Sequence, residues 1–382
     1  MALKSNLGFG MMRLPVRGGD PTDFDYEQLN AMVDAFLSSG FTYFDTSYVY
    51  HNGRSEEATR KAVVERHPRD SFTVATKFPT FLLKDEADIE PIFASQLENL
   101  GVDYIDYYLL HNIQTVYYDG VDGRGGIVKT AHLFEHAAAW KAAGKIRHLG
   151  FSFHSSAKLL DRILSEHPEV EFVQIPFNYI DAESELVQAM EAYRVIRRHG
   201  REAIFMEPVK GGGLASMPRA AADKLREMDE QATLASWAIR YAGSFDGVIC
   251  TLSGMSTLEQ VADNVHSVRQ LNPLSEAEME SLREVVRLYK DAGPIGADLE
   301  KYRGLLCHGA PVTGVLEAYN MCQLQPDPGF SDDNNYFKNT VAEEAHLDIF
   351  GRLPEERYLL ADGTDATDLV RRAEAWLIEH SF

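Results

Sequence analysis

The chain has 382 residues, of which 37 are Lys or Arg and 58 are Asp or Glu, so its formal net charge is −21. A protein that binds a polyanion needs clustered cations, so this acidic excess argues against nucleic acid and against anionic membrane surfaces as partners. Apolar residues make up 45% of the chain and charged residues 25%, which excludes a disordered or fibrous protein and predicts a buried core.

The cysteines and the first residues bear on the cellular compartment. Cys250, Cys307 and Cys322 are too few and too irregularly spaced for a disulfide framework. The first ten residues lack the apolar segment of a secretory signal, and no stretch approaches the roughly 18 apolar residues of a membrane span. We therefore expect a cytoplasmic protein in a reducing environment.

Short apolar runs alternate with amphipathic stretches up to about residue 270, which is the pattern of βα units around a parallel sheet. The predicted strands are residues 7–10, 41–45, 72–77, 104–111, 146–152, 172–175, 203–207 and 248–252. The predicted helices are residues 26–39, one capped by Ser55, 89–100, 131–143, 155–164, 183–198, 233–241 and 258–268.

Eight strands alternating with eight helices favour a closed (β/α)8 barrel, in which every strand is parallel and no sheet edge is exposed. The alternative is a doubly wound open sheet, which usually carries a G-x-G-x-x-G sequence after its first strand. Residues 7–15 lack that sequence. We therefore predict an α/β barrel over residues 1–290 and a helical C-terminal extension over residues 291–382.

In such a barrel the active site lies at the carboxyl ends of the strands. The ionisable residues at the predicted strand ends are Asp45, Tyr50, Lys77 and His111. Singly, each has an ordinary structural interpretation, such as a helix cap for Asp45 or core packing for His111.

Together these four side chains suit carbonyl reduction. A tyrosine, with a pKa normally near 10, can donate a proton at neutral pH when a cation stabilises its phenolate, and Lys77 supplies that charge. Asp45 would keep the Lys77 ammonium charged and oriented. His111 would donate a hydrogen bond to a substrate carbonyl oxygen.

Several stretches of this sequence resemble the aldo-keto reductase superfamily. They are LGFGMMRLP at residues 7–15, YFDTSYVYHNGRSEEATRKAV at 43–63, VATKF, YYLLHN and GKIRHLGFS. The resemblance implies a catalytic Asp, Tyr, Lys, His tetrad and hydride transfer from a nicotinamide cofactor to a carbonyl. In the family the proton donor follows the Asp by five residues, which selects Tyr50 over Tyr48 as general acid.

The later strands resemble the family's cofactor side. Ser152 and Gln174 match positions that hydrogen-bond the nicotinamide carboxamide, although Phe153 replaces the usual Asn. Met206 falls where the family often stacks a Tyr on the nicotinamide, and core packing is the alternative interpretation. The predicted cofactor-binding residues are Gly10, Met11, Met12, Asp45, Ser152, Gln174, Met206, Glu207, Pro208, Val209, Lys210, Gly211, Gly212, Gly254, Met255, Ser256, Gln260, Asp263 and Asn264.

Within this set, the loop EPVKGGGLAS is the best phosphate-binding candidate on physical grounds. Its glycines expose backbone amides, it follows the seventh strand, and Lys210 adds a positive charge. A flexible loop is the alternative interpretation.

The segment after the eighth strand resembles the family's adenosine-binding stretch, with Asp263 and Asn264 at the positions that hold the adenine. Where NADPH-dependent relatives clamp the 2′-phosphate with Lys or Arg, this chain has Gly254, Met255 and Gln260. Without charge-assisted bonds at these positions, both NAD(H) and NADP(H) stay open, and NADH is slightly favoured.

The tail resembles the ferredoxin-like module that ends some bacterial aldo-keto reductases, with the cluster-binding cysteines absent. An iron–sulfur cluster needs about four thiolates, so we expect none. We expect Cys307 and His308 to be structural and predict no metal site, with a metal-binding pair as the alternative interpretation. A final amphipathic helix carries a stripe that we expect to dock on the barrel or on a partner subunit. The stripe is Leu369, Val370, Ala373, Trp376 and Leu377.

We therefore predict an NAD(P)-dependent oxidoreductase acting on a small-molecule carbonyl or alcohol, with its substrate, reaction direction and any homo-oligomer left open. One alternative is an enzyme that retains NAD and oxidises a sugar transiently before elimination or epimerisation. A second is a cofactor-binding sensor with slow turnover.

Overall fold

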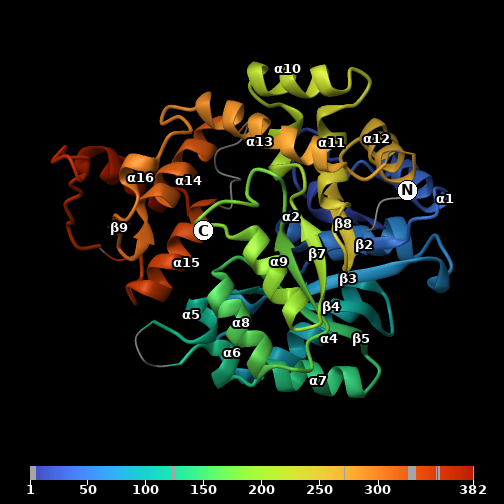
Figure 1. Ribbon diagram of the computed structural model, residues 1–382. Coiled ribbons are helices and arrows are strands. Elements are labelled where there is room, and N and C mark those ends of the chain that lie inside the picture. The colour runs from blue at the N-terminus through green and yellow to red at the C-terminus, as the bar shows by residue number, and fades with distance from the viewer. Residues whose placement is uncertain are drawn as a thin grey trace.

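In the computed structural model, eight parallel strands close into a barrel in sequence order, with helices around it (Figure 1). The structure describes residues 6–121, 125–270, 272–325, 333–349, 351 and 353–381. The predicted fold class and all eight predicted strands are confirmed. The strands are β1 Asn6–Gly10, β2 Tyr43–Asp45, β3 Thr73–Phe78, β4 Ile105–Ile113, β5 Ile146–Phe153, β6 Phe172–Pro176, β7 Glu202–Met206 and β8 Val248–Gly254.

Pairing of β1 with β8 closes the barrel, and a glycine of β1 leaves room for interior side chains of β8. Gly8 pairs with Leu252, and a Cβ at Gly8 would lie 2.4 Å from Leu252 Cδ2 and 3.0 Å from Cys250 Sγ. Side chains from most strands fill the interior, so the barrel encloses a packed core and no pore. This interior cluster is Tyr43, Ala75, Leu109, Phe172, Ile204, Cys250 and Leu252.

The helices around the barrel mostly follow the predicted pattern. They are α1 Tyr26–Ser38, α2 Tyr50–Gly53, α3 Ser55–Thr59, α4 Ile89–Leu100, α5 Thr115–Tyr118, α6 Ile127–Thr130, α7 Leu133–Ala142, α8 Ala157–Glu166, α9 Ala189–Arg198, α10 Arg219–Met228, α11 Leu234–Ala242, α12 Leu258–Arg269 and α13 Glu276–Asp291. Helix α10 was not predicted; it packs against α13 outside the barrel.

Two helix predictions were wrong in detail. Ser55 is not an N-cap, because its hydroxyl donates to the carbonyl of Met11 and accepts from Thr46. The helix predicted from residue 183 begins at Ala189, because the preceding segment is a series of turns in which the Asn178 side chain accepts from the amide of Asp181.

The C-terminal extension forms a lobe beside the barrel (Figure 1). It contains helices α14 Val312–Leu324, α15 Asp333–Glu344 and α16 Thr367–Glu379. It also contains a short antiparallel hairpin, β9 Leu306–Cys307 with β10 Ala310–Pro311, which the prediction of a purely helical tail missed. Helix α13 runs through the predicted division at residue 290, and that boundary stays a prediction.

The extension docks on the carboxyl-end side of the barrel mainly through α15. Asn339 donates to the carbonyl of His154, just after β5, and Lys158 pairs with Glu344 at 3.0 Å. The final helix behaves differently from the expectation: α16 packs mainly against α14 and α15, so its apolar stripe is covered within the lobe.

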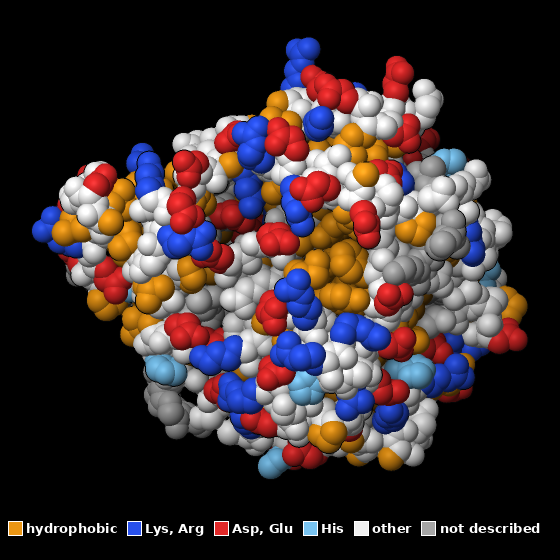
Figure 2. All heavy atoms as spheres, in the orientation of Figure 1, with side chains coloured by type: hydrophobic (Ala, Val, Ile, Leu, Met, Phe, Trp, Pro, Cys, Tyr) orange, Lys and Arg blue, Asp and Glu red, His pale blue; other side chains and the backbone are white. Residues whose placement is uncertain are grey.

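Side chains of both charges lie on the surface, as expected from the composition of the chain. Lys and Arg side chains lie interspersed with Asp and Glu on the face drawn in Figure 2. Among the described residues, no helix combines the length and the apolar character that crossing a membrane requires.

Candidate active site

A buried ion pair lies between the ends of β2 and β3. The Lys77 ammonium donates to Asp45 Oδ1 at 2.5 Å and to the carbonyl of Thr46 at 2.8 Å. Both side chains are almost completely buried, and the ammonium also lies 4.7 Å from the centroid of the Tyr50 ring. The structure thus brings three of the four predicted catalytic side chains together.

The ionisation of this group follows from its burial and its neighbours. Burial alone would lower the pKa of Lys77, but the charges of Asp45 and Tyr50 outweigh that effect and raise it, so the ammonium stays charged. Burial raises the pKa of Tyr50, and Lys77 opposes part of that rise. The free protein therefore holds Tyr50 as a neutral phenol, in contrast to the expected lowering of its pKa.

His111 reaches the same mouth because β4 is irregular. The pairing of β4 with β5 shifts register between Leu110 and Ile113, and Asn112 takes a left-handed conformation with φ 58°. Such bulges redirect neighbouring side chains and are common beside active sites. The His111 ring lies 6.1 Å from the Tyr50 ring, edge to face, and its Nδ1 is 3.2 Å from the Ser47 hydroxyl.

A second polar layer supports Lys77, and sequence reasoning missed it. Glu56 is buried and accepts from Thr76 at 2.7 Å and from Gln96 at 2.8 Å. Gln96 also donates to the carbonyl of Lys77 at 3.0 Å, and Tyr108 donates to Gln96.

The predicted nicotinamide side carries unsatisfied acceptors. Ser152 Oγ accepts from the amide of Asn112 at 2.8 Å, and Gln174 Nε2 donates to the Met206 sulfur at 3.3 Å. Among the described residues, Asp45 Oδ2, Asn112 Oδ1 and Gln174 Oε1 are buried acceptors without a hydrogen-bond partner. Buried acceptors normally have partners, so these three atoms mark a place for a donor-bearing ligand.

The loop after β7 has an unusual backbone. Glu207, Lys210, Gly211 and Gly212 all have positive φ values, of 53°, 46°, 62° and 100°. Within the loop, the amide of Lys210 donates to the carbonyl of Glu207, and the amides of Gly212 and Leu214 donate to the carbonyl of Val209. Pro208 and Val209 complete the turn into the short 3-10 helix Lys210–Ala215.

The role predicted for the Lys210 charge is not supported. Its ammonium is buried and donates to Asp181 at 2.7 Å and to Asp333 of α15 at 2.8 Å. It therefore fastens the C-terminal extension to the β7 loop. No local pattern predicts this contact, because Asp333 lies 123 residues away from Lys210 in the chain.

The segment after β8 is tied to the loop after β1. Ser256 donates through its hydroxyl to the carbonyl of Arg13 at 2.7 Å, and its amide donates to Gln260. Arg13 lies against Gly254, where a Cβ would be 3.1 Å from its Cδ, so a cation absent from the predicted set borders this segment.

The predicted adenine-binding pair differs in exposure. Asp263 accepts from the hydroxyl of Thr233 at the surface, whereas Asn264 is buried and donates to Ser253. Of the remaining predicted cofactor residues, Met11 and Met255 are buried, Met12 is 42% exposed, and Gly10 ends β1.

Comparison with known proteins decides the family. The sequence profile of the Aldo/keto reductase family matches residues 6–287. The chain belongs to the aldo/keto reductase family. An aldo-keto reductase of Mycolicibacterium vanbaalenii is 31% identical over 260 residues, covering 66% of this reductase and 82% of the relative. One from Strobilurus tenacellus is 30% identical over 204 residues, covering 50% of this chain and only 55% of the relative.

Solved structures support the fold of this aldo/keto reductase. An aldo-keto reductase from Klebsiella pneumoniae, in complex with NADPH, aligns with a TM-score of 0.59 at 20% identity, covering 76% of this chain and 96% of that one. The apo form of one from Bacillus halodurans aligns with a TM-score of 0.54 at 22% identity, covering 74% and 92%.

The Lys210 ion cluster of this reductase yields a prediction for stability. Lys210→Met leaves two buried carboxylates uncompensated and should lower the free energy of unfolding by about 3–5 kcal/mol. Lys158→Met is the matched control, since it breaks another contact between the barrel and α15 at a lysine 73% exposed, and should cost at most about 1 kcal/mol. Urea unfolding followed by circular dichroism measures both; equal losses would contradict the assignment.

Proposed function

We propose that this chain transfers hydride between a nicotinamide cofactor and a small carbonyl or alcohol substrate, with Tyr50 as general acid and base. The observation that carries the proposal is the buried Lys77–Asp45 pair beside Tyr50, with His111 across from it. A buried ion pair is a weak source of stability, so its position beside an ionisable phenol supports a chemical role.

The proton transfer follows from this arrangement. As hydride reaches the carbonyl carbon, Tyr50 gives its proton to the carbonyl oxygen, and the C–O double bond becomes an alcohol. The phenolate that remains lies beside the Lys77 ammonium, which Asp45 keeps charged. Tyr50 regains its proton from solvent before the next turnover.

His111 orients the carbonyl oxygen in this proposal. If the Ser47 hydroxyl donates to Nδ1, the ring carries its proton on Nε2 and can donate there to the substrate. The Nε2–H of His111 and the Tyr50 phenol would then both donate to the carbonyl oxygen. These two hydrogen bonds polarise the carbonyl before hydride arrives.

The unsatisfied acceptors fit a nicotinamide. Its carboxamide amine can donate to Gln174 Oε1 or Asn112 Oδ1, and Ser152 lies next to them. Bound NAD(P)H supplies the hydride. The relative from Klebsiella pneumoniae that binds NADPH supports a nicotinamide cofactor for this chain.

We propose NADH as the preferred cofactor. Gly254, Met255 and Gln260 offer no charge to a 2′-phosphate, and the Gln260 side chain already accepts from the amide of Ser256. Arg13 is the cation that borders this segment, and Arg13→Met isolates its contribution to either cofactor.

Replacing the proposed proton donor tests the function directly. Tyr50→Phe should leave NADH binding within about twofold and cut carbonyl reduction by about 10²- to 10⁴-fold, because it removes general acid catalysis alone. Fluorescence titration measures binding, and turnover of a panel of small aldehydes, alicyclic ketones and sugars measures reduction. Tyr48→Phe, two residues earlier, is the matched control and should retain wild-type turnover.

Unchanged turnover in Tyr50→Phe, or an equal loss in Tyr48→Phe, would contradict the assignment of Tyr50.

The pH dependence tests the protonation state of Tyr50. Because burial raises its pKa, the phenol stays protonated up to high pH, so kcat/KM for carbonyl reduction should be constant from about pH 7 to 9. Alcohol oxidation needs the phenolate, so its kcat/KM should rise throughout this range. A fall in reduction across neutral pH would show that the pKa of Tyr50 is lowered instead.

A further inference from the structure

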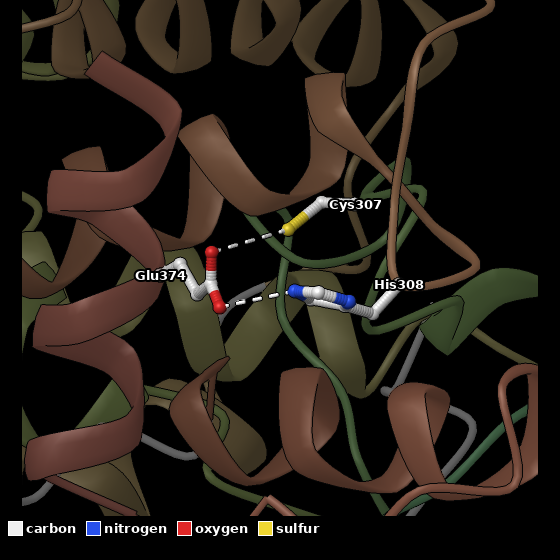
Figure 3. A group of neighbouring side chains, drawn as sticks. All are labelled: Cys307, His308 and Glu374. Carbon is white, nitrogen blue, oxygen red and sulfur yellow. Dashed lines mark hydrogen bonds and ion pairs between the residues drawn. The ribbon is translucent and has the colours of Figure 1, made fainter. Parts of the chain in front are cut away.

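A compact cluster of metal-ligating side chains lies in the C-terminal extension, away from the proposed active site. Figure 3 shows Cys307, His308 and Glu374 pointing toward one another. His308 Nε2 is 3.0 Å from one Glu374 oxygen, Cys307 Sγ is 4.0 Å from the other, and the ligand atoms all lie within 4.8 Å of one another. We propose that Cys307, His308 and Glu374 bind one Zn²⁺ ion.

The geometry needs little adjustment to hold the ion. With zinc bonds of about 2.0–2.3 Å, neighbouring ligand atoms in a tetrahedral site are about 3.3–3.7 Å apart. The observed separations bracket that range, so side-chain rotation suffices to close the site. Thiolate, imidazole and carboxylate together are the donor set that zinc takes among the common divalent cations.

The backbone presents the first two ligands on a tight hairpin. Cys307 ends β9, and the two-residue turn of His308 and Gly309 has φ values of 48° and 85°. Consecutive positive φ values are those of a type I′ hairpin turn, which fixes the direction of both side chains. Glu374 comes from the middle of α16, so the ion would join the hairpin to the last helix.

A second set of side chains orients the ligands as in known zinc sites. Glu356 Oε2 accepts from the backbone amide of His308 at 3.0 Å and lies 3.6 Å from the Nδ1 of its ring, opposite the nitrogen that faces Glu374. Metal-binding histidines commonly direct their second nitrogen at a carboxylate. Tyr358 completes this set, with its hydroxyl 2.9 Å from Glu356 and 3.3 Å from Cys307 Sγ.

Burial and access both suit a bound ion. Cys307 is fully buried, and the side chains of His308 and Glu374 are 2% and 14% exposed. A surface hollow of about 460 Å³ reaches Glu356 and Glu374, with Pro354, Arg371 and Glu379 also in its wall. It gives the ion a route in and leaves the fourth coordination position to water.

Binding exchanges a proton for the ion. Zn²⁺ coordination breaks the S–H bond, forms the Zn–S bond and releases the proton to solvent, with no change of oxidation state.

The test uses the full chain, stripped with a chelator and then supplied with Zn²⁺ or Co²⁺. We expect about one zinc per chain by elemental analysis, a thiolate-to-cobalt charge-transfer band, and a melting temperature that rises on adding zinc. Cys307→Ser should abolish the cobalt band, and Cys322→Ser, at another buried cysteine of the extension, should retain it.

A second variant covers the case in which Cys307→Ser fails to fold. Glu374→Gln keeps the shape of the side chain and should weaken zinc binding at least tenfold, whereas Glu379→Gln, on the same helix, should leave it unchanged. Absence of bound zinc and of the cobalt band in the folded wild-type chain would overturn the proposal. So would a cobalt band that survives Cys307→Ser, or equal affinities in the two glutamate variants.

Discussion

Closure of the eight-stranded barrel is the constraint on which the proposed chemistry depends. Because the strands are all parallel and pair in sequence order, the carboxyl ends of β2, β3 and β4 meet at one mouth. Asp45, Lys77 and His111 therefore come together although they are spread over 66 residues of the chain. At Gly8, where β1 pairs with β8, a larger residue would crowd the side chains of Leu252 and Cys250 inside the barrel.

Two buried ion clusters among the described residues have separate tasks. Lys77 and Asp45 lie beneath the proposed active site, where the pair holds a positive charge beside Tyr50. Lys210 and its two carboxylates join the β7 loop to α15. The ammonium in the first pair is available to stabilise a phenolate, whereas the second is fully engaged in fastening the extension.

The elements and the proposed site differ in how far sequence alone predicts them. The barrel strands were found because continuous apolar runs between amphipathic helices are local signals, and the four ionisable residues follow directly from the strand ends. Helix α15 was not predicted as a separate element. It buries Asn334, Asn335 and Asn339 as well as apolar residues, so its buried positions form no apolar stripe. The burial of polar side chains depends on partners that are distant in the chain, so a local sequence pattern does not predict it.

Long-range partners also explain the errors in residue roles. Within its own loop, Lys210 resembles a phosphate ligand, but its ammonium pairs with Asp333 of the extension. Cys307 and His308 were predicted to be structural, and the zinc site that we propose needs Glu374 from the last helix as well. The Glu56 network behind Lys77 likewise joins four separate elements, α3, β3, α4 and β4, through side chains.

The most direct test of the central claim is titration of the purified wild-type chain with NADH and NADPH, after analysis of the protein for cofactor retained through purification. The account predicts protein free of tightly held cofactor, one reduced nicotinamide bound per chain, and an affinity for NADH at least equal to that for NADPH. Folded protein that binds neither cofactor would contradict it. Cofactor that remains bound and does not exchange would favour an internal redox cycle over simple carbonyl reduction.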